Sequence, residues 1–259
     1  MNFDFWQELT NAFSQPGVPE LSLEPARRQR QDELMKKMTD VVHAYPLQEP
    51  LCQLKTKTEI HYYHSLRVGL MIYELTSQEE TLLRVIPHQS ILAAGLLHDY
   101  GKTLIPDEIL KKSGEHNSRE RQIMRSHNRL SFASPQLQVL EENYFPYLRK
   151  IAIRHHPYPR QKNDRRATQR RQLELLATSG LREGNERRRI EQRITNLALD
   201  RAGVLLALCD QYDAWNSRRE YKEPDTLEKV REKFYQNFPA EEISLLDYLI
   251  LGYPNPLEK

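Results

Sequence analysis

His98 and Asp99 stand next to each other at the end of an apolar run, and Lys102 follows three positions later. The run covers residues 91–97 and contains no charged side chain. If this run is a helix that carries the pair into the interior, both groups need partners, because burying them without any is costly. Neighbouring helical side chains point about 100° apart. One metal ion can therefore sit between them, and the second oxygen of the carboxylate can face another ion.

Other polar side chains also lie at the ends of apolar helical stretches. Buried polar groups are almost always satisfied, so these residues need each other or a metal ion. Together they form a set of five imidazoles and two carboxylates, which suits two transition-metal ions. The candidate ligands are His64, His98, Asp99, His127, His155, His156 and Asp210. Ordinary hydrogen-bonded or solvated roles are expected for the histidines in polar or loop-like stretches, which are His43, His61, His88 and His116.

The composition indicates a soluble protein with a polar surface. Of 259 residues, 29% are charged, and the formal net charge of +2 argues against a dedicated nucleic-acid binder. No apolar run approaches the roughly 20 residues that cross a bilayer, and the N-terminus lacks the basic region of a signal peptide. The two cysteines, Cys52 and Cys209, lie far apart and suit a reducing compartment. We therefore expect a cytoplasmic protein without membrane contact.

Apolar residues recur with a helical period along most of the chain, which predicts an all-α fold. Expected helices cover residues 64–75, residues 118–132 behind an N-cap at Asn117, and residues 198–215. Another should begin at Pro224 and bury a stripe of Leu227, Val230 and Phe234. No strand-turn-strand pattern is visible, and the chain contains nine glycines.

Proline-containing breaks divide the chain near its start. Residues 15–19 and residues 45–50 interrupt the helical pattern before the long apolar helices begin. We therefore expect a short N-terminal helical lead-in over residues 1–50, followed by one helical domain over residues 51–259.

Short sequence motifs around the candidate ligands give the strongest indication of function. Residues 98–102 read HDYGK and residues 105–110 read IPDEIL, while residues 210–214 read DQYDA and residues 219–222 read REYK. With His64, His127 and the pair His155-His156 in their order, the chain resembles the HD superfamily of metal phosphohydrolases. The closer resemblance is to its HD-GYP branch, whose members hydrolyse cyclic di-GMP, and it covers about residues 64–222.

This resemblance implies an HD-domain helical bundle and a role for each matched residue. One metal would be held by His64, His98, Asp99 and Asp210. Asp99 would bridge to a second metal held by His127, His155 and His156. Lys102 would lie near the scissile phosphate, and Arg219 and Lys222 would contact phosphates of the substrate. Asp213 is expected to be a structural hydrogen-bonding residue and not a ligand.

A two-metal site of this kind has a defined chemistry. Two ions about 3.5–4 Å apart can share a hydroxide, lower its pKa and clamp a phosphoryl oxygen. Ligation rich in imidazole suits Fe, Mn, Ni or Zn better than Mg. The resemblance places Ile60 where some relatives carry a Glu that supports a third metal, so we expect two ions.

The chain departs from the HD-GYP pattern directly after His156. The family's HHExxDGxGYP phrase is replaced by HHPYPRQK, which removes the loop that normally helps to recognise the guanine-containing substrate. Cyclic di-GMP stays the first expected substrate. The alternatives are another nucleotide or phosphoester, or a degenerate domain that binds a nucleotide or a signalling partner without turnover. The phrase Gly252-Tyr253-Pro254 lies far outside the expected position, and we interpret it as a coincidence.

A basic insertion occupies the place of the missing loop, over about residues 160–193. It contains eleven Arg and Lys residues against five acidic ones. One interpretation is a solvated insertion that carries a helix. The other is an electropositive lid that attracts a phosphate-rich ligand or an acidic partner. No aromatic residues interleave with the arginines, so nucleic-acid binding is the weaker prediction.

Overall fold

The computed structural model describes the chain except for residues 1–2, 156–184, 219–222, 239 and 258–259. The described residues form helices and no strand, which confirms the predicted all-α fold. The helices are α1 (Phe5–Phe13), α2 (Pro25–Ala44), α3 (Gln48–Lys57), α4 (Glu59–Thr76), α5 (Glu80–Leu83), α6 (His88–Leu97), η1 (Tyr100–Leu104), α7 (Asp107–Leu110), α8 (Ser118–Arg125), α9 (His127–Ala133), α10 (Pro135–Asn143), α11 (Leu148–Ala152), η2 (Ile153–His155), α13 (Asn185–Asn216), α14 (Leu227–Asn237), η4 (Ala240–Glu242) and α15 (Ile243–Gly252).

The centre of the bundle is the pair α4 and α6, which pack against each other more extensively than any other two elements among the described residues. Nearly every residue of α4 is buried, as is α6 from Ser90 to Leu97. Two glycines let the helix backbones approach closely, because an added Cβ at Gly95 would lie 3.1 Å from Cα of Gly69 and 2.7 Å from Cγ2 of Ile72. This close crossing brings the first turns of α4 next to the C-terminal end of α6.

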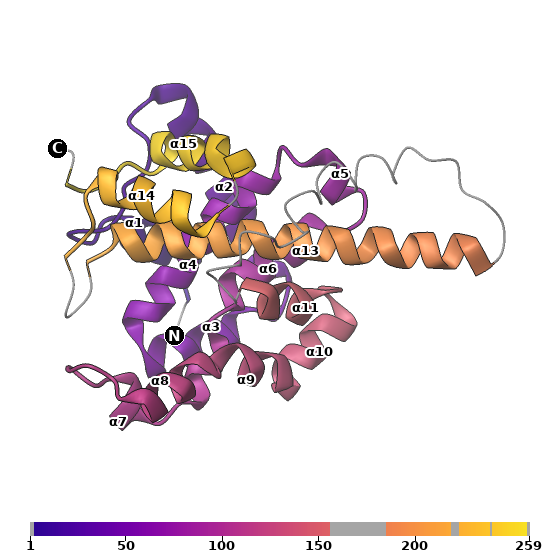
Figure 1. Ribbon diagram of the computed structural model, residues 1–259, viewed down its shortest axis with the longest axis horizontal. Helices are drawn as coiled ribbons and strands as arrows, with labels where there is room; N and C mark the ends of the chain where they lie inside the picture. The colour runs from indigo at the N-terminus through magenta and orange to yellow at the C-terminus, as the bar shows by residue number, and fades with distance from the viewer. Residues whose placement is uncertain (1–2, 156–184, 219–222, 239, 258–259) are drawn as a thin grey trace.

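The long helix α13 crosses the whole bundle and packs against α4, α11 and η2 (Figure 1). It contains the helix expected over residues 198–215 but begins much earlier, at Asn185. Its apolar part, residues 202–209, is buried, whereas its N-terminal end extends beyond the other described helices in Figure 1. This continuous buried run stops directly before Asp210, one of the predicted ligands.

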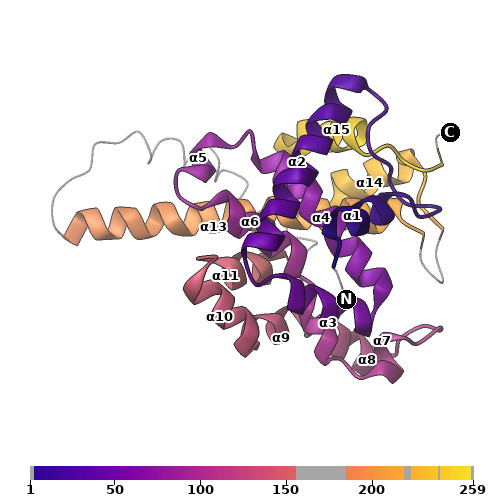
Figure 2. The ribbon, with the colours of Figure 1, turned by 180° about the vertical axis from the view of Figure 1, so that it is seen from behind.

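The N-terminal helices share the core of the rest of the bundle. Phe5 and Leu9 of α1 are fully buried within the same apolar cluster as α4, and α1 and α2 both pack on α4 (Figure 2). The fully buried Glu74 of α4 connects α2 with the C-terminal segment, because it accepts hydrogen bonds from Gln31 of α2 and from the hydroxyl of Tyr253. The domain boundary near residue 50 stays a prediction.

The structure corrects two of the predicted helix limits. Asn117 caps α8 as expected, through a capping box with Glu120, but this helix ends at Arg125 and α9 begins at His127. The prediction that Pro224 opens the next helix is wrong, because Thr226 is its N-cap and its side chain accepts a hydrogen bond from the backbone N–H of Lys229. Val230 and Phe234 are buried as predicted, whereas Leu227, the third residue of the expected stripe, is only half-buried.

None of the helices in the described part of the chain is long and apolar enough to cross a membrane.

Candidate metal centre

Helix ends and buried helix faces bring most of the predicted ligands together. His64 lies on α4, His98 and Asp99 follow the last residue of α6, and His127 begins α9. His155 ends η2, and Asp210 lies on α13. The side chain of Asp210 is 17% exposed, whereas the other five residues are buried. The centre therefore lies inside the bundle and is reached by solvent on the Asp210 side.

Three of the histidines are oriented by the same kind of hydrogen bond to the backbone. In each, Nδ1 contacts the backbone carbonyl oxygen of the residue three positions earlier. The distance is 2.8 Å from His98 to Gly95 and 2.6 Å from His127 to Met124, and His155 makes the same contact with Ala152. A ring whose Nδ1–H donates to a carbonyl keeps the lone pair of Nε2 for a metal.

His64 obtains the same orientation from a carboxylate. Its Nδ1 donates to Oδ2 of Asp213 at 2.7 Å, and Asp213 also pairs with Arg67. Burial acts to raise the pKa of Asp213, but Arg67 and His64 hold that pKa well below its usual range. Asp213 is thus charged and hydrogen bonded, which is the structural role predicted for it.

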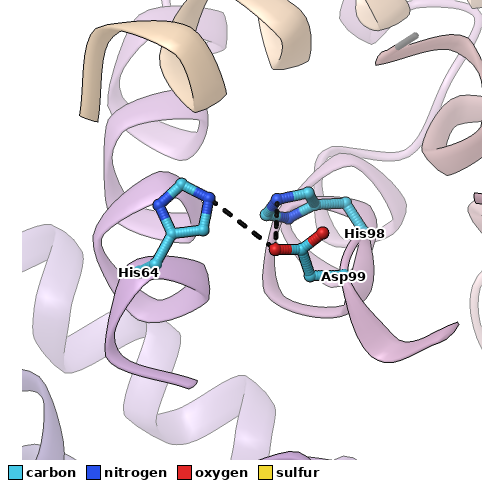
Figure 3. A group of neighbouring side chains, drawn as sticks. All are labelled: His64, His98 and Asp99. Atoms are coloured by element: carbon cyan, nitrogen blue, oxygen red, sulfur yellow. Dashed lines mark ion pairs between the residues drawn. The ribbon is translucent and has the colours of Figure 1, made fainter. Parts of the chain in front are cut away.

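The first group of ligand atoms surrounds Nε2 of His64 and Nε2 of His98 (Figure 3). Oδ1 of Asp210 lies 3.0 Å from the former and 3.7 Å from the latter. Oδ2 of Asp99 lies 3.8 Å and 3.7 Å from the same two nitrogens. These four side chains are the ligands that the family resemblance assigns to the first metal.

The second group shares Asp99 with the first. Oδ1 of Asp99 lies 3.3 Å from Nε2 of His127. The Nε2 atoms of His127 and His155 are 3.5 Å apart. The two oxygens of one carboxylate therefore face two different groups of imidazoles. Such an arrangement would allow one carboxylate to bridge two ions.

The chemistry of the donor atoms fits bound metal. Nε2 of His98 is fully buried and has no hydrogen-bond partner among the described residues. The lone pair of Nε2 in His64 faces a carboxylate oxygen, and two Nε2 atoms face each other in the second group. Such contacts are repulsive unless a proton or a cation lies between them. Zn–N bonds of about 2.1 Å in a tetrahedral site place two nitrogens about 3.4 Å apart, close to the spacing in the second group.

The electrostatics of the centre favour an ionised carboxylate at its middle. Burial acts to raise the pKa of Asp99, but Lys102, His98 and His127 hold the pKa well below its usual range. Burial likewise opposes protonation of His98, and the charges of Asp99 and Asp210 outweigh it and raise the pKa of that imidazole. A divalent cation would replace the stabilising positive charge and displace the proton.

Lys102 lies within the centre, as its position after the His-Asp pair suggests. It is 9% exposed, and its Nζ donates to Oδ2 of Asp99 at 2.6 Å. The short helix η1 carries it back over the carboxylate. A buried ammonium at this distance can donate to an anionic oxygen bound next to Asp99.

The absence of a side chain at Gly101 allows η1 to pack closely against α9, which carries His127 of the second group. An added Cβ there would lie 1.9 Å from the carbonyl oxygen of His127, so only glycine lets η1 approach α9 this closely. The backbone N–H of Gly101 donates to Oγ of Ser131 at 2.6 Å, and that hydroxyl contacts the carbonyl of His98 at 3.3 Å.

We expect Gly101→Ala to displace α9 and to weaken metal binding by the second group. The clash involves backbone atoms, so the loss of stability should be on the order of 1–3 kcal/mol. Thermal unfolding and metal content measured by mass spectrometry check both effects. Gly114→Ala is the matched control, because an added Cβ at Gly114 meets nothing within 4 Å. Full metal content in Gly101→Ala would refute this account of the second group.

Some predicted residues lie outside the part of the chain that the structure describes. They are the ligand His156, the substrate contacts Arg219 and Lys222, and residues 160–184 of the basic insertion. Residues 185–193 of that insertion belong to α13.

Two residues near the centre were not recognised from the sequence. Arg67 holds Asp213. His61 lies near enough to Asp99 to add, when protonated, to the effect of Lys102, His98 and His127 in lowering the pKa of that carboxyl, although polar surroundings had suggested an ordinary role for it. The spacing of His61 and His64, which places both on one side of a helix, was the available signal.

The other histidines have ordinary roles. His43 is exposed, His116 pairs with the carbonyl of Ile109, and burial lowers the pKa of His88 to about 4.

Three curated relatives act on cyclic dinucleotides. The chain is 30% identical over 170 residues to a cyclic di-GMP phosphodiesterase of Thermotoga maritima, an alignment that covers 64% of this chain and 37% of the relative. It is 35% identical over 95 residues to a cyclic di-GMP phosphodiesterase of Pseudomonas aeruginosa, covering 35% and 22%. It is 28% identical over 140 residues to a 3'3'-cGAMP-specific phosphodiesterase of Vibrio cholerae, covering 54% and 22%. The chain thus spans well under half the length of each relative.

The family model of the HD domain matches residues 61–215. This match begins at the turn of α4 that carries His61 and His64 and ends after Asp210 and Asp213 on α13, so it includes every candidate ligand. Because it covers more than half of the chain, it identifies the protein as a member of the HD domain family.

Proposed function

We propose that this chain is a two-metal phosphodiesterase that hydrolyses a cyclic dinucleotide, with cyclic di-GMP as the first candidate. The observation that carries the proposal is the position of Asp99, whose two oxygens face two separate groups of imidazoles. Shared carboxylates of this kind are typical of two-metal phosphoesterases. The activities of the three relatives support the same class of substrate.

The ions would be held by His64, His98, Asp99 and Asp210 in the first site, and by Asp99, His127, His155 and His156 in the second. Donors rich in imidazole favour Fe, Mn, Ni or Zn. When bound, the ions would supply an activated water and would neutralise negative charge on a phosphate. The free thiols of Cys52 and Cys209 support a cytoplasmic location for such a protein.

The chain's own residues would orient and stabilise the reacting phosphate. Lys102 would donate from Nζ to a phosphoryl oxygen, at the edge of the site where it now contacts Asp99. Arg219 and Lys222 would bind the phosphates of the substrate. The backbone carbonyls that orient His98 and His127 would keep their Nε2 atoms directed to the centre throughout the reaction.

A second candidate is hydrolysis of a different phosphoester, and one observation favours it. The phrase after His156 lacks the family's guanine-recognition loop and carries arginines in its place. A changed loop beside an intact set of ligands indicates retained chemistry with altered substrate choice.

The test is product analysis with protein purified anaerobically and loaded with Fe(II) or Mn(II). The substrates are cyclic di-GMP, 3'3'-cGAMP and bis(p-nitrophenyl) phosphate. We expect a linear dinucleotide from a cyclic substrate, and loss of turnover after chelation. If only the aryl phosphodiester were turned over, the proposed substrate would be another phosphoester and not a cyclic dinucleotide. Absence of all turnover from a metal-loaded protein would indicate a binding domain and contradict the enzymatic proposal.

A further inference from the structure

A buried arginine stands directly behind the first metal site. Arg67 lies on α4, 3% exposed, one turn after His64. Its Nε donates to Oδ1 of Asp213 at 2.6 Å and its Nη2 to Oδ2 at 3.0 Å, which is a two-point ion pair. The same Oδ2 accepts the hydrogen bond from Nδ1 of His64. The guanidinium therefore fixes the carboxylate that fixes the imidazole.

The remaining donors of Arg67 bind two other segments of the chain. Nη1 donates to the backbone carbonyl of Ala12 in α1 at 3.0 Å, and Nη2 also contacts Oγ of Ser217 at 3.3 Å. Ala12 is fully buried and Ser217 is 2% exposed, so water does not compete for these contacts. Arg67 thus joins the N-terminal helix, the end of α13 and the ligand-bearing turn of α4.

The geometry suits arginine and no other cation. A planar guanidinium can bind a carboxylate with two parallel hydrogen bonds and still direct donors to two further acceptors, whereas a lysine ammonium acts as a point charge. Removing one partner of a buried ion pair leaves the other charge unpaired, which is strongly unfavourable. The carboxylate that accepts the hydrogen bond from His64 is thus paired with a guanidinium that also contacts α1.

We propose that Arg67 is a positioning residue that couples docking of the N-terminal helix α1 to metal binding by His64. The inference rests on the proposed two-metal function. Because coupling between two sites is reciprocal, metal bound at His64 should also stabilise α1 in its place. Loss of a partner behind a metal ligand typically weakens metal affinity about 10–100-fold.

The test compares Arg67→Lys with Arg201→Lys. Arg201 is the matched control, because it is also 3% exposed and also paired with carboxylates, Glu79 and Glu242, neither of which is a candidate ligand. Both variants should lose thermal stability. Only Arg67→Lys should bind Mn(II) or Zn(II) about 10–100-fold more weakly in competition with a chelator. Asp213→Asn, which keeps the shape of the side chain, should show the same selective loss and serves if Arg67→Lys does not fold.

Hydrogen exchange tests the coupling itself. Adding Mn(II) to the wild-type protein should slow amide exchange in α1, and this effect should disappear in Arg67→Lys or Asp213→Asn. Equal metal affinity in wild type, Arg67→Lys and Asp213→Asn, or α1 exchange that is indifferent to metal, would overturn the proposal. Selective loss of affinity in a protein without phosphodiesterase turnover would uphold the coupling and reject the proposed function alone. A wild type that binds no metal would reject both.

Discussion

Replacing Asp99 by alanine is expected to abolish turnover and to impair both metal sites at once. The two oxygens of this carboxylate face different groups of imidazoles, so no other described residue can substitute for it. We expect a rate at least about 10³-fold below wild type, at or beyond the upper end of the effect of losing one charge-stabilising group. Metal content measured by mass spectrometry should fall below one ion per chain, whereas the wild type should hold two.

A surface aspartate provides the control for this prediction. Asp247→Ala removes a carboxylate that is 49% exposed and pairs with Arg231 at 2.9 Å, and it should leave metal content and rate unchanged. Retention of both ions or of full activity in Asp99→Ala would refute the bridging assignment.

Lys102→Met is expected to separate metal binding from catalysis. The methionine keeps the apolar length of the side chain but cannot donate to a phosphate, so turnover should fall about 10²–10³-fold. Metal binding should persist or tighten, because the ammonium now occupies Oδ2 of Asp99 at 2.6 Å and competes with a cation for that oxygen. Steady-state kinetics and chelator competition on one preparation measure both quantities.

The control for Lys102 is Lys112→Met, which removes a lysine that is 34% exposed and paired with Glu120. It should change neither quantity. If Lys102→Met lost its metal together with its activity, Lys102 would be a structural support for the centre and not a substrate contact.

The sequence predicts the fold and a set of candidate ligands for one physical reason. Polar side chains at the ends of apolar helices must be satisfied inside the bundle, and the periodicity reveals those helices. His64, His98 and Asp99 could be recognised on this basis, and the structure brings them together within one group. The extent of α13 was underestimated because its first turns are charged, and charged residues give no apolar stripe to detect.

Contacts between distant segments could not be predicted from one sequence. Arg67 is one of many arginines until folding places it against Asp213 and the carbonyl of Ala12. The need for glycine at position 101 arises from the backbone of His127, which follows it by 26 positions. Local signals also compete, as at the start of α14, where the side-chain cap of Thr226 prevails over the preference of Pro224 for a first turn.

Anomalous diffraction from crystals of the metal-loaded protein tests the central claim most directly. The account predicts two anomalous peaks about 3.5–4 Å apart, one on each side of the carboxylate of Asp99. The first should be bonded to Nε2 of His64 and His98, and the second to Nε2 of His127 and His155. A single peak, or two peaks of which neither contacts Asp99, would contradict a two-metal centre bridged by this residue.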